Sequence, residues 1–147
     1  MSTIVNPANI FKTSNEQETQ QIQTTISTTL LTTCRSPDVE TRVTAMRALT
    51  LIINALPFQP ARSHDFEIEL LEAVREALND YTINERGDIG SLVRTEALAV
   101  VEFIWQTDTC ADSPQRTTLE LAVRRLALER LDKLRLRAAI CLSLIHI

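Results

Sequence analysis

Apolar residues recur at a helical period along most of this chain. The first such stripe has members four residues apart: Ile22, Ile26 and Leu30. This spacing places them on one face of a helix. Ser14 and Gln17 form a capping box ahead of the stripe. We therefore predict a first helix over 14–33, preceded by an extended or disordered lead-in over 1–13.

The second helix has the clearest start and end signals. Ser36 is a capping residue, and Pro37 suits the first helical position because its missing N–H costs no hydrogen bond there. Pro57 then ends the helix. Between these signals runs a stripe that we expect to be buried: Val39, Val43, Met46, Leu49, Ile53 and Leu56.

The same period predicts four further helices, over about 65–80, 88–106, 116–131 and from 132 onward. The expected buried face of the third helix is Phe66, Leu70, Val74 and Leu78. That of the fourth is Leu92, Val93, Ala97, Val101, Ile104 and Trp105. Together the six helices make three antiparallel pairs: 14–56, 65–106 and 116–141.

An arginine-led motif recurs in the second helix of each pair. It starts at Arg42, Arg94 and Arg135, and each arginine is followed three residues later by alanine. The intervals between the arginines are close to the period of about 40–47 residues of HEAT and armadillo units. Small residues let paired helices approach closely, and an arginine near the helix start can reach carboxylates of a neighbouring unit. We predict an all-α fold, an α-solenoid of HEAT- or armadillo-like pairs.

Composition agrees with this fold and narrows the chemistry. The chain has 2 Gly and 5 Pro, too few for a turn-rich β fold. Its net charge of -4 argues against nucleic-acid binding by the whole domain. Basic residues gather from Arg116 onward, where seven face three acidic residues. This half either presents a basic face to a partner or is a solvated helix surface with i,i+4 ion pairs.

No set of residues has the pattern of a catalytic or metal site. The 3 cysteines, Cys34, Cys110 and Cys141, are far apart, so we expect reduced thiols, with Cys141 in the core. His64 and His146 are the only histidines. We predict that the chain is not an enzyme and has no cofactor and no metal. No apolar run is long enough for a signal peptide or a membrane span.

Both glycines lie in one short stretch. Gly87 can adopt a positive φ and end a turn, and Asp88 can then cap the fourth helix. Gly90 would let a neighbouring backbone or a partner come close. The polar residues at this hairpin tip need not serve the core, so Glu85, Arg86 and Asp88 are also candidates for partner binding. Capping and turn geometry remain the alternative for Asp88.

The glycine stretch also resembles a known family. Residues 79–98, NDYTINERGDIGSLVRTEAL, resemble the segment DYT…RGDVGSWVR typical of the tubulin-folding cofactor D family. Residues 129–142, ERLDKLRLRAAICL, are similar to its segment EKIDRFRAHAA. The resemblance covers about 69–142 and departs at Ile89 and Leu92, where the family has Val and Trp. The matching positions of the first segment are Asp80, Tyr81, Thr82, Arg86, Gly87, Asp88, Gly90, Ser91, Val93 and Arg94.

The resemblance implies a non-enzymatic scaffold. Family members are cytosolic HEAT-repeat proteins that capture β-tubulin and join it to α-tubulin with cofactor E. With cofactor C they stimulate GTP hydrolysis by tubulin, and they bind a small Arf-like GTPase. We thus expect a cytoplasmic protein associated with the microtubule cytoskeleton. The alternative is a generic HEAT adaptor or spacer with an unrelated partner, in which Asp88 and Arg94 are internal struts.

The last residues, LSLIHI at 142–147, break off in mid-helix with an apolar tail. They match one reading frame of a common sequencing adapter, so we expect a non-native tail. A fragment of a longer solenoid is the other interpretation. Both imply that the natural chain continues, as does the greater length of the resembled family, of which this sequence would be a piece from the C-terminal HEAT-repeat region.

Overall fold

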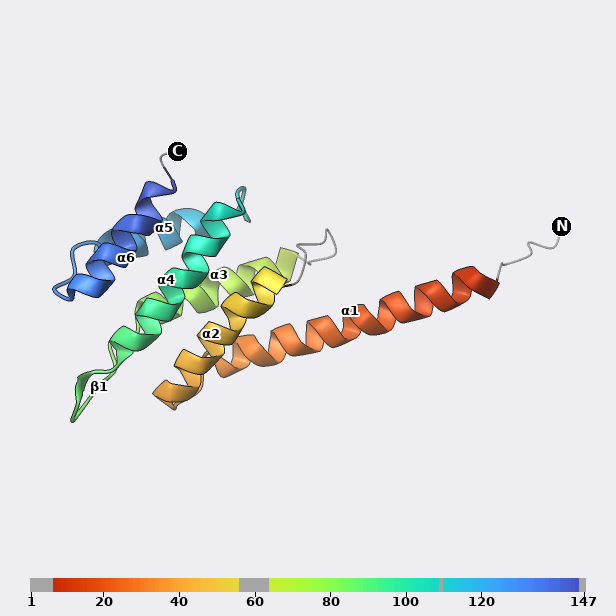
Figure 1. Cartoon of the computed structure of the whole chain (residues 1–147), viewed down its shortest axis with the longest axis horizontal. Helices are drawn as coiled ribbons and strands as arrows, with labels where there is room; N and C mark the ends of the chain where they lie inside the picture. Colours follow the sequence, from red (N-terminus) through yellow and green to blue (C-terminus); the bar gives the residue numbers. More distant parts are fainter. Residues whose placement is uncertain (1–6, 56–63, 109, 146–147) are drawn as a thin grey trace.

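A computed structural model describes residues 7–55, 64–108 and 110–145 of the chain, and it confirms the all-α prediction (Figure 1). The described helices are α1 (Pro7–Thr33), α2 (Val39–Ala55), α3 (His64–Leu78), α4 (Gly90–Gln106), α5 (Gln115–Leu126) and α6 (Asp132–Ser143). A short antiparallel hairpin, β1 (Ile83–Asn84) and β2 (Gly87–Asp88), joins α3 to α4.

The helices form two layers of a helical-repeat fold. α2, α4 and α6 lie side by side in one layer, and α5 packs on α3 in the other, where α1 also touches α3. Each sequence pair packs together across the layers, α1 on α2, α3 on α4 and α5 on α6. α4 therefore contacts three helices, and Figure 1 shows it in the middle of the stack.

The core lies between the two layers and follows most of the predicted stripes. Buried residues from these stripes are Met46, Leu49, Ile53, Leu70, Val74, Leu78, Val93, Ala97, Val101, Ile104 and Trp105. Val39, Val43 and Phe66 are partly buried against this core. Leu92 was predicted to be buried, but it is 57% exposed. It lies in the first turn of α4 and borders a groove instead of the core.

The first helix departs most from the prediction. It begins at Pro7, so residues 7–13 of the predicted lead-in are helical and Ser14 lies inside the helix. Figure 1 shows its N-terminal half extending away from the other helices. Ile22 and Ile26 are exposed, against the predicted burial, whereas Leu30 packs on the core.

The boundaries of the other helices differ by a few residues. Asp38, and not Ser36, caps α2, because its Oδ2 accepts hydrogen bonds from the Thr41 backbone N–H (2.8 Å) and Oγ1 (2.6 Å). Pro37 thus precedes the helix. The predicted stripe member Leu56 lies outside the described residues. α5 ends at Leu126, five residues earlier than predicted, in a turn closed by backbone hydrogen bonds.

The three cysteines are buried thiols, and Cys141 is in the core, as predicted. Burial raises the pKa of Cys34 to about 11 and that of Cys141 to about 12. The Cys141 thiol donates to the Leu98 carbonyl oxygen at 3.4 Å. In the described part of the chain, no helix has the length and apolar character needed to span a bilayer.

Candidate functional site

The hairpin between α3 and α4 carries the predicted site residues. Ile83 pairs with Asp88 and Asn84 with Gly87, which leaves Glu85 and Arg86 at the tip. The Asn84 side chain supports the tip because its Oδ1 accepts from the Arg86 backbone N–H at 2.8 Å. Gly87 has φ of +100°, so the prediction of a glycine turn is confirmed.

Gly90 is required for a close approach between two backbones. Its N–H donates to the Thr82 carbonyl oxygen at 2.9 Å. A Cβ at this position would clash with the Asp80 carbonyl oxygen and lie 2.6 Å from the backbone nitrogen of Thr82. The predicted close contact is therefore with the chain's own loop, and it fixes the base of the hairpin.

Arg94 is fully buried beneath the hairpin and holds it from below. Its guanidinium donates to the Asp88 carboxylate at 2.6 and 3.1 Å and to the Asp80 carbonyl oxygen at 2.5 Å. It also lies 4.1 Å from the centre of the Tyr81 ring. Its Nε is 4.0 Å from Oε1 of Glu129, a residue of the next helix pair. Arg94 thus links two units of the stack.

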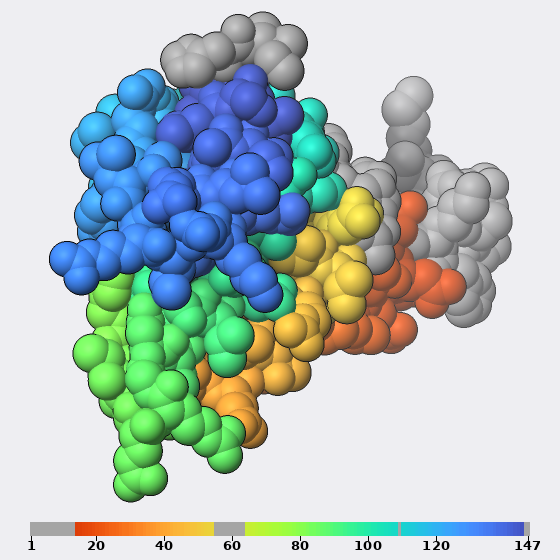
Figure 2. All heavy atoms as spheres, turned by 60° about the vertical axis from the view of Figure 1, so that its left-hand side comes forward, coloured from red at the N-terminus to blue at the C-terminus, as the bar shows by residue number. Residues whose placement is uncertain are grey.

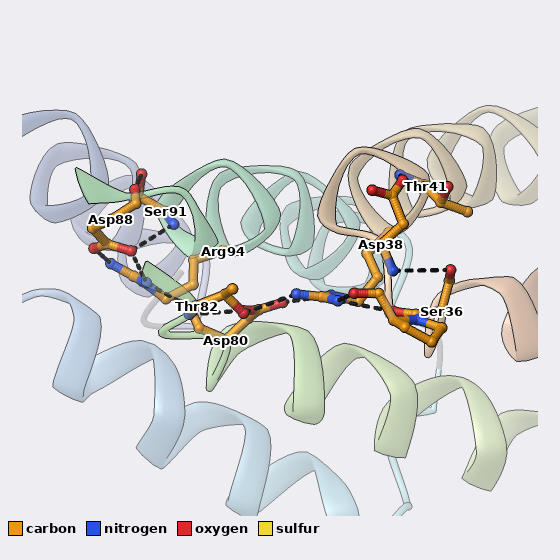
Figure 3. A network of polar contacts seen from close by, with 10 residues as sticks. Ser36, Asp38, Thr41, Asp80, Thr82, Asp88, Ser91 and Arg94 are labelled. Atoms are coloured by element: carbon orange, nitrogen blue, oxygen red, sulfur yellow. Dashed lines mark hydrogen bonds and ion pairs between the residues drawn. The ribbon is translucent and has the colours of Figure 1, made fainter. Parts of the chain in front are cut away.

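Arg42 makes the equivalent link from the first unit. Its Nε donates to Oδ2 of Asp80 at 2.8 Å, and Nη2 donates to Oγ1 of Thr82 at 2.9 Å. Nη1 binds the carbonyl oxygens of Ser36 and Pro37 in its own unit. The predicted reach of motif arginines to neighbouring units is confirmed for Arg42. Figure 3 shows the polar chain that results, from Asp88 and Arg94 through Asp80 to Ser36.

The third motif arginine, Arg135, stays within its own unit. It contacts the Asp132 carboxylate and donates to the Glu129 carbonyl oxygen at 3.2 Å, and its side chain is half exposed. All three motif arginines therefore bind the turn that precedes their own helix. Arg42 and Arg94 also contact the corresponding turn of the next helix pair.

The structure separates the three predicted partner-binding residues. Asp88 is engaged within the chain, because it pairs with Arg94 and its Oδ1 accepts from the Ser91 backbone N–H at 3.1 Å. It caps the first turn of α4, as the alternative reading of this residue predicted. Glu85 and Arg86 are exposed, and neither side chain has an ion-pair partner in the described ranges. Partner binding by any of the three stays a prediction.

We expect the Asp88–Arg94 pair to make the fold less stable in acid. Hydrogen bonds from Arg94 hold the pKa of Asp88 below its ordinary value, outweighing the opposing effect of burial. Such a carboxylate stabilises the fold above its unfolded pKa of about 3.9, and the contribution is lost as pH falls through the lower folded pKa. Urea denaturation of the parent and of Asp88→Asn from neutral pH to about pH 3 would measure it.

The asparagine variant isolates the charge, because asparagine is also a good helix cap. Asp88→Asn should unfold at lower urea than the parent at neutral pH, and the two should converge in acid. A difference that stays constant across this pH range would contradict the assignment of the effect to the ionised carboxylate.

A groove runs beside the hairpin, between it and the start of α2. Its volume is about 780 Å³, and Arg86 and Asp88 form part of one wall. Its apolar lining comes from Val39, Val43 and Leu92, together with Ile89 and Pro37. The groove is not predicted by the sequence pattern, because Val39, Val43 and Leu92 have the spacing of core residues. The one signal in the sequence was at position 92, where the resembled family has Trp in place of Leu92. This difference indicated that position 92 is not an ordinary core position.

The basic C-terminal half is mostly a surface of ion pairs. Arg116 pairs with Asp108, Arg124 with Glu120 and Arg137 with Glu102 at 2.6–2.9 Å. Arg125 donates to the Leu78 carbonyl oxygen and lies near the Tyr81 ring. This arrangement favours the solvated-surface interpretation for most of the half. Two basic residues have no acidic partner among the described residues: Arg130, in the turn between α5 and α6, and Lys133, in the first turn of α6.

The described residues contain no group of three His, Cys, Asp or Glu side chains that could hold a metal ion. Comparison of the chain with models of known families, with curated proteins and with solved structures finds no match. Membership of the cofactor D family therefore stays a prediction from the two sequence segments.

Proposed function

We propose that this chain is part of a tubulin-folding scaffold of the cofactor D type. It binds β-tubulin, assists assembly of the αβ-tubulin heterodimer, and acts with cofactors C and E in stimulating GTP hydrolysis by tubulin. A small Arf-like GTPase is a further partner implied by the resemblance. The place of action is the cytoplasm, at the microtubule cytoskeleton. The chain itself performs no chemistry in this proposal.

The observation that carries the proposal is how the motif residues are used. Most of the residues shared with the family segment have internal tasks. Asp80, Thr82, Asp88 and Arg94 belong to the polar network, and Gly90 permits the close backbone approach. Arg86 is shared too, but its side chain is exposed at the tip and has no ion pair in the described ranges. A residue free of structural work is the natural candidate for partner contact.

The groove beside Arg86 supplies apolar surface for the same contact. An exposed cation next to partly exposed aliphatic side chains combines the two features of a protein-binding surface, an apolar centre and a polar rim. Leu92 and Val43 would provide the centre, and the rim holds Arg86 and Asn84 together with the carboxylates of Asp38, Glu40 and Asp88. Rigid support from Arg94 keeps this surface preorganised, which lowers the entropy cost of binding.

Replacing Arg86 tests the proposal. We expect Arg86→Gln to weaken binding of the chain to β-tubulin by about fivefold at low salt, the effect of one rim charge. Binding would be measured by biolayer interferometry with immobilised tubulin. The matched control is Thr117→Glu, which changes net charge by the same amount in the first turn of α5. This control should bind like the parent.

The alternative function is a spacer or adaptor with an unrelated partner. The links from Arg42 and Arg94 to following units favour it, because they show a chain built to stack. A folded chain that does not bind tubulin at any salt concentration would support the spacer function and contradict the tubulin proposal. Helical circular dichroism, equal for all variants, would show that folding is not the cause.

A further inference from the structure

Three exposed cations occupy two neighbouring turns of the stack. Arg86 is at the tip of the hairpin, Arg130 is in the turn between α5 and α6, and Lys133 is in the first turn of α6. In the residues that the structure covers, none of the three has an acidic side chain within ion-pair distance. They are therefore available to a ligand.

The two turns are fastened to each other. The Tyr81 hydroxyl, at the base of the hairpin, donates to Oε1 of Glu129 at 2.5 Å. Arg94 approaches the same carboxylate from below at 4.0 Å. Figure 2 shows the α5–α6 segment directly above the hairpin on one face of the molecule. The cations thus belong to one surface, which we call the turn surface and define as residues 81–88 and 128–133.

The acidic residues of the turn surface are largely committed to internal contacts. Glu129 is held by Tyr81, Asp88 by Arg94 and Asp132 by Arg135. Glu85 is the one acid of the two segments without an ion pair among the described residues. Three cations of the turn surface thus lack an ion pair among the described residues, against one carboxylate, although the whole chain has a net charge of -4.

Exposed apolar side chains lie among these cations. Ile83 is 74% exposed and Leu128 is 85% exposed, and Leu131 is also exposed. Isolated exposed aliphatic residues are ordinary, but these three share one surface with the uncommitted charges. A ligand that complements the turn surface needs negative charges for the cations and apolar side chains for the aliphatic residues.

We propose that the turn surface binds an acidic, extended peptide segment of a protein partner, in which glutamate or aspartate alternates with apolar residues. An extended peptide advances about 3.3 Å per residue, so a segment of about ten residues spans roughly 33 Å. This inference rests on the proposed function only in taking the partner to be a protein. Nucleic acid fits less well, because Tyr81 is the one aromatic residue of the two segments, and although it is 45% exposed, Arg94 lies over its ring and its hydroxyl is bonded to Glu129.

A synthetic peptide tests the inference directly. The probe is a fluorescein-labelled, glutamate-rich peptide with interspersed leucines, titrated with the full chain and followed by fluorescence anisotropy. We expect Arg130→Gln/Lys133→Gln to weaken binding by about fivefold at low salt, and addition of Arg86→Gln to bring the loss to about tenfold. The matched control, Thr117→Glu/Thr118→Glu, has the same net charge as the double variant and should bind like the parent.

Several outcomes would overturn the inference. Equal weakening in the control would mean that only net charge matters. A single-stranded oligonucleotide that binds the same residues more tightly than the peptide would assign the turn surface to nucleic acid. Tubulin binding without peptide binding would leave the proposed function standing and remove the inference. Peptide binding that depends on the three cations, without tubulin binding, would support the inference and contradict the proposed function.

Discussion

Replacing Arg94 with leucine should lower the free energy of unfolding by about 3–5 kcal/mol. The guanidinium is fully buried, and its loss removes both of its hydrogen bonds to the Asp88 carboxylate and the one to the Asp80 carbonyl oxygen. Removing one partner of a buried charge pair typically costs about 3–5 kcal/mol, and we expect the lower end of this range because the Asp88 side chain is 34% exposed and keeps the Ser91 N–H. Urea denaturation followed by far-ultraviolet circular dichroism would measure the change.

The same motif supplies a matched control in Arg135. This arginine begins the third copy of the motif, but its side chain is half exposed and its carboxylate partner, Asp132, is highly exposed. Exposed pairs contribute about 0–1 kcal/mol, so Arg135→Leu should have a small effect. Equal losses at the two positions would mean that the burial of Arg94 does not determine its contribution.

The second large effect is expected at Gly90. Alanine there would place its Cβ against the backbone of Asp80 and Thr82, and backbone atoms cannot move aside as a flexible side chain can. Overpacking of this kind costs typically 1–3 kcal/mol and occasionally more, and we expect about 3 kcal/mol. The loss should appear as a lower midpoint of thermal unfolding.

Gly87→Ala provides the comparison at the other glycine. Nothing lies within 4 Å of a Cβ added there, so its cost comes only from the positive φ of +100°. A left-handed conformation costs an ordinary residue about 1–2 kcal/mol. A greater loss at Gly87 than at Gly90 would show that turn geometry, and not the close approach, holds the hairpin base.

The sequence predicted both a helix and its buried face where the apolar stripe is strong and another helix packs against it. The α3 stripe of Leu70, Val74 and Leu78 is wide enough to define both the helix and its buried face. The stripe of Ile22 and Ile26 looks the same by periodicity, yet both are exposed. Periodicity identifies an amphipathic face, but it carries no information on whether another helix covers that face.

Helix starts depended on contacts that local sequence does not encode. Ser36 and Asp38 are both good capping residues, and local preference does not choose between them. In the structure, Arg42 binds the carbonyl oxygens of Ser36 and Pro37, which keeps both residues in the turn. The helix therefore begins after Asp38. This choice follows from a side chain one turn further along, which capping rules do not consider.

The sequence located the candidate site, but it did not show which of its residues support the fold and which are exposed. Glycine placement and charge indicated a turn and an exposed tip, and both are present. The spacer interpretation made Asp88 and Arg94 internal struts, but it did not name the partners that the complete burial of an arginine requires. Those partners, Tyr81 and Glu129, come from different units and meet only in the fold.

The buried thiols give the stack a chemical reporter at each end. The thiolate is the form that reacts with alkylating reagents, and a pKa of about 11 for Cys34 and about 12 for Cys141 leaves almost none at neutral pH. Modification therefore requires local opening of the fold. Cys34 belongs to the first helix pair and Cys141 to the last. The alkylation rates of Cys34 and Cys141 therefore measure how often the first and the last helix pair unfold locally while the helices between them stay folded.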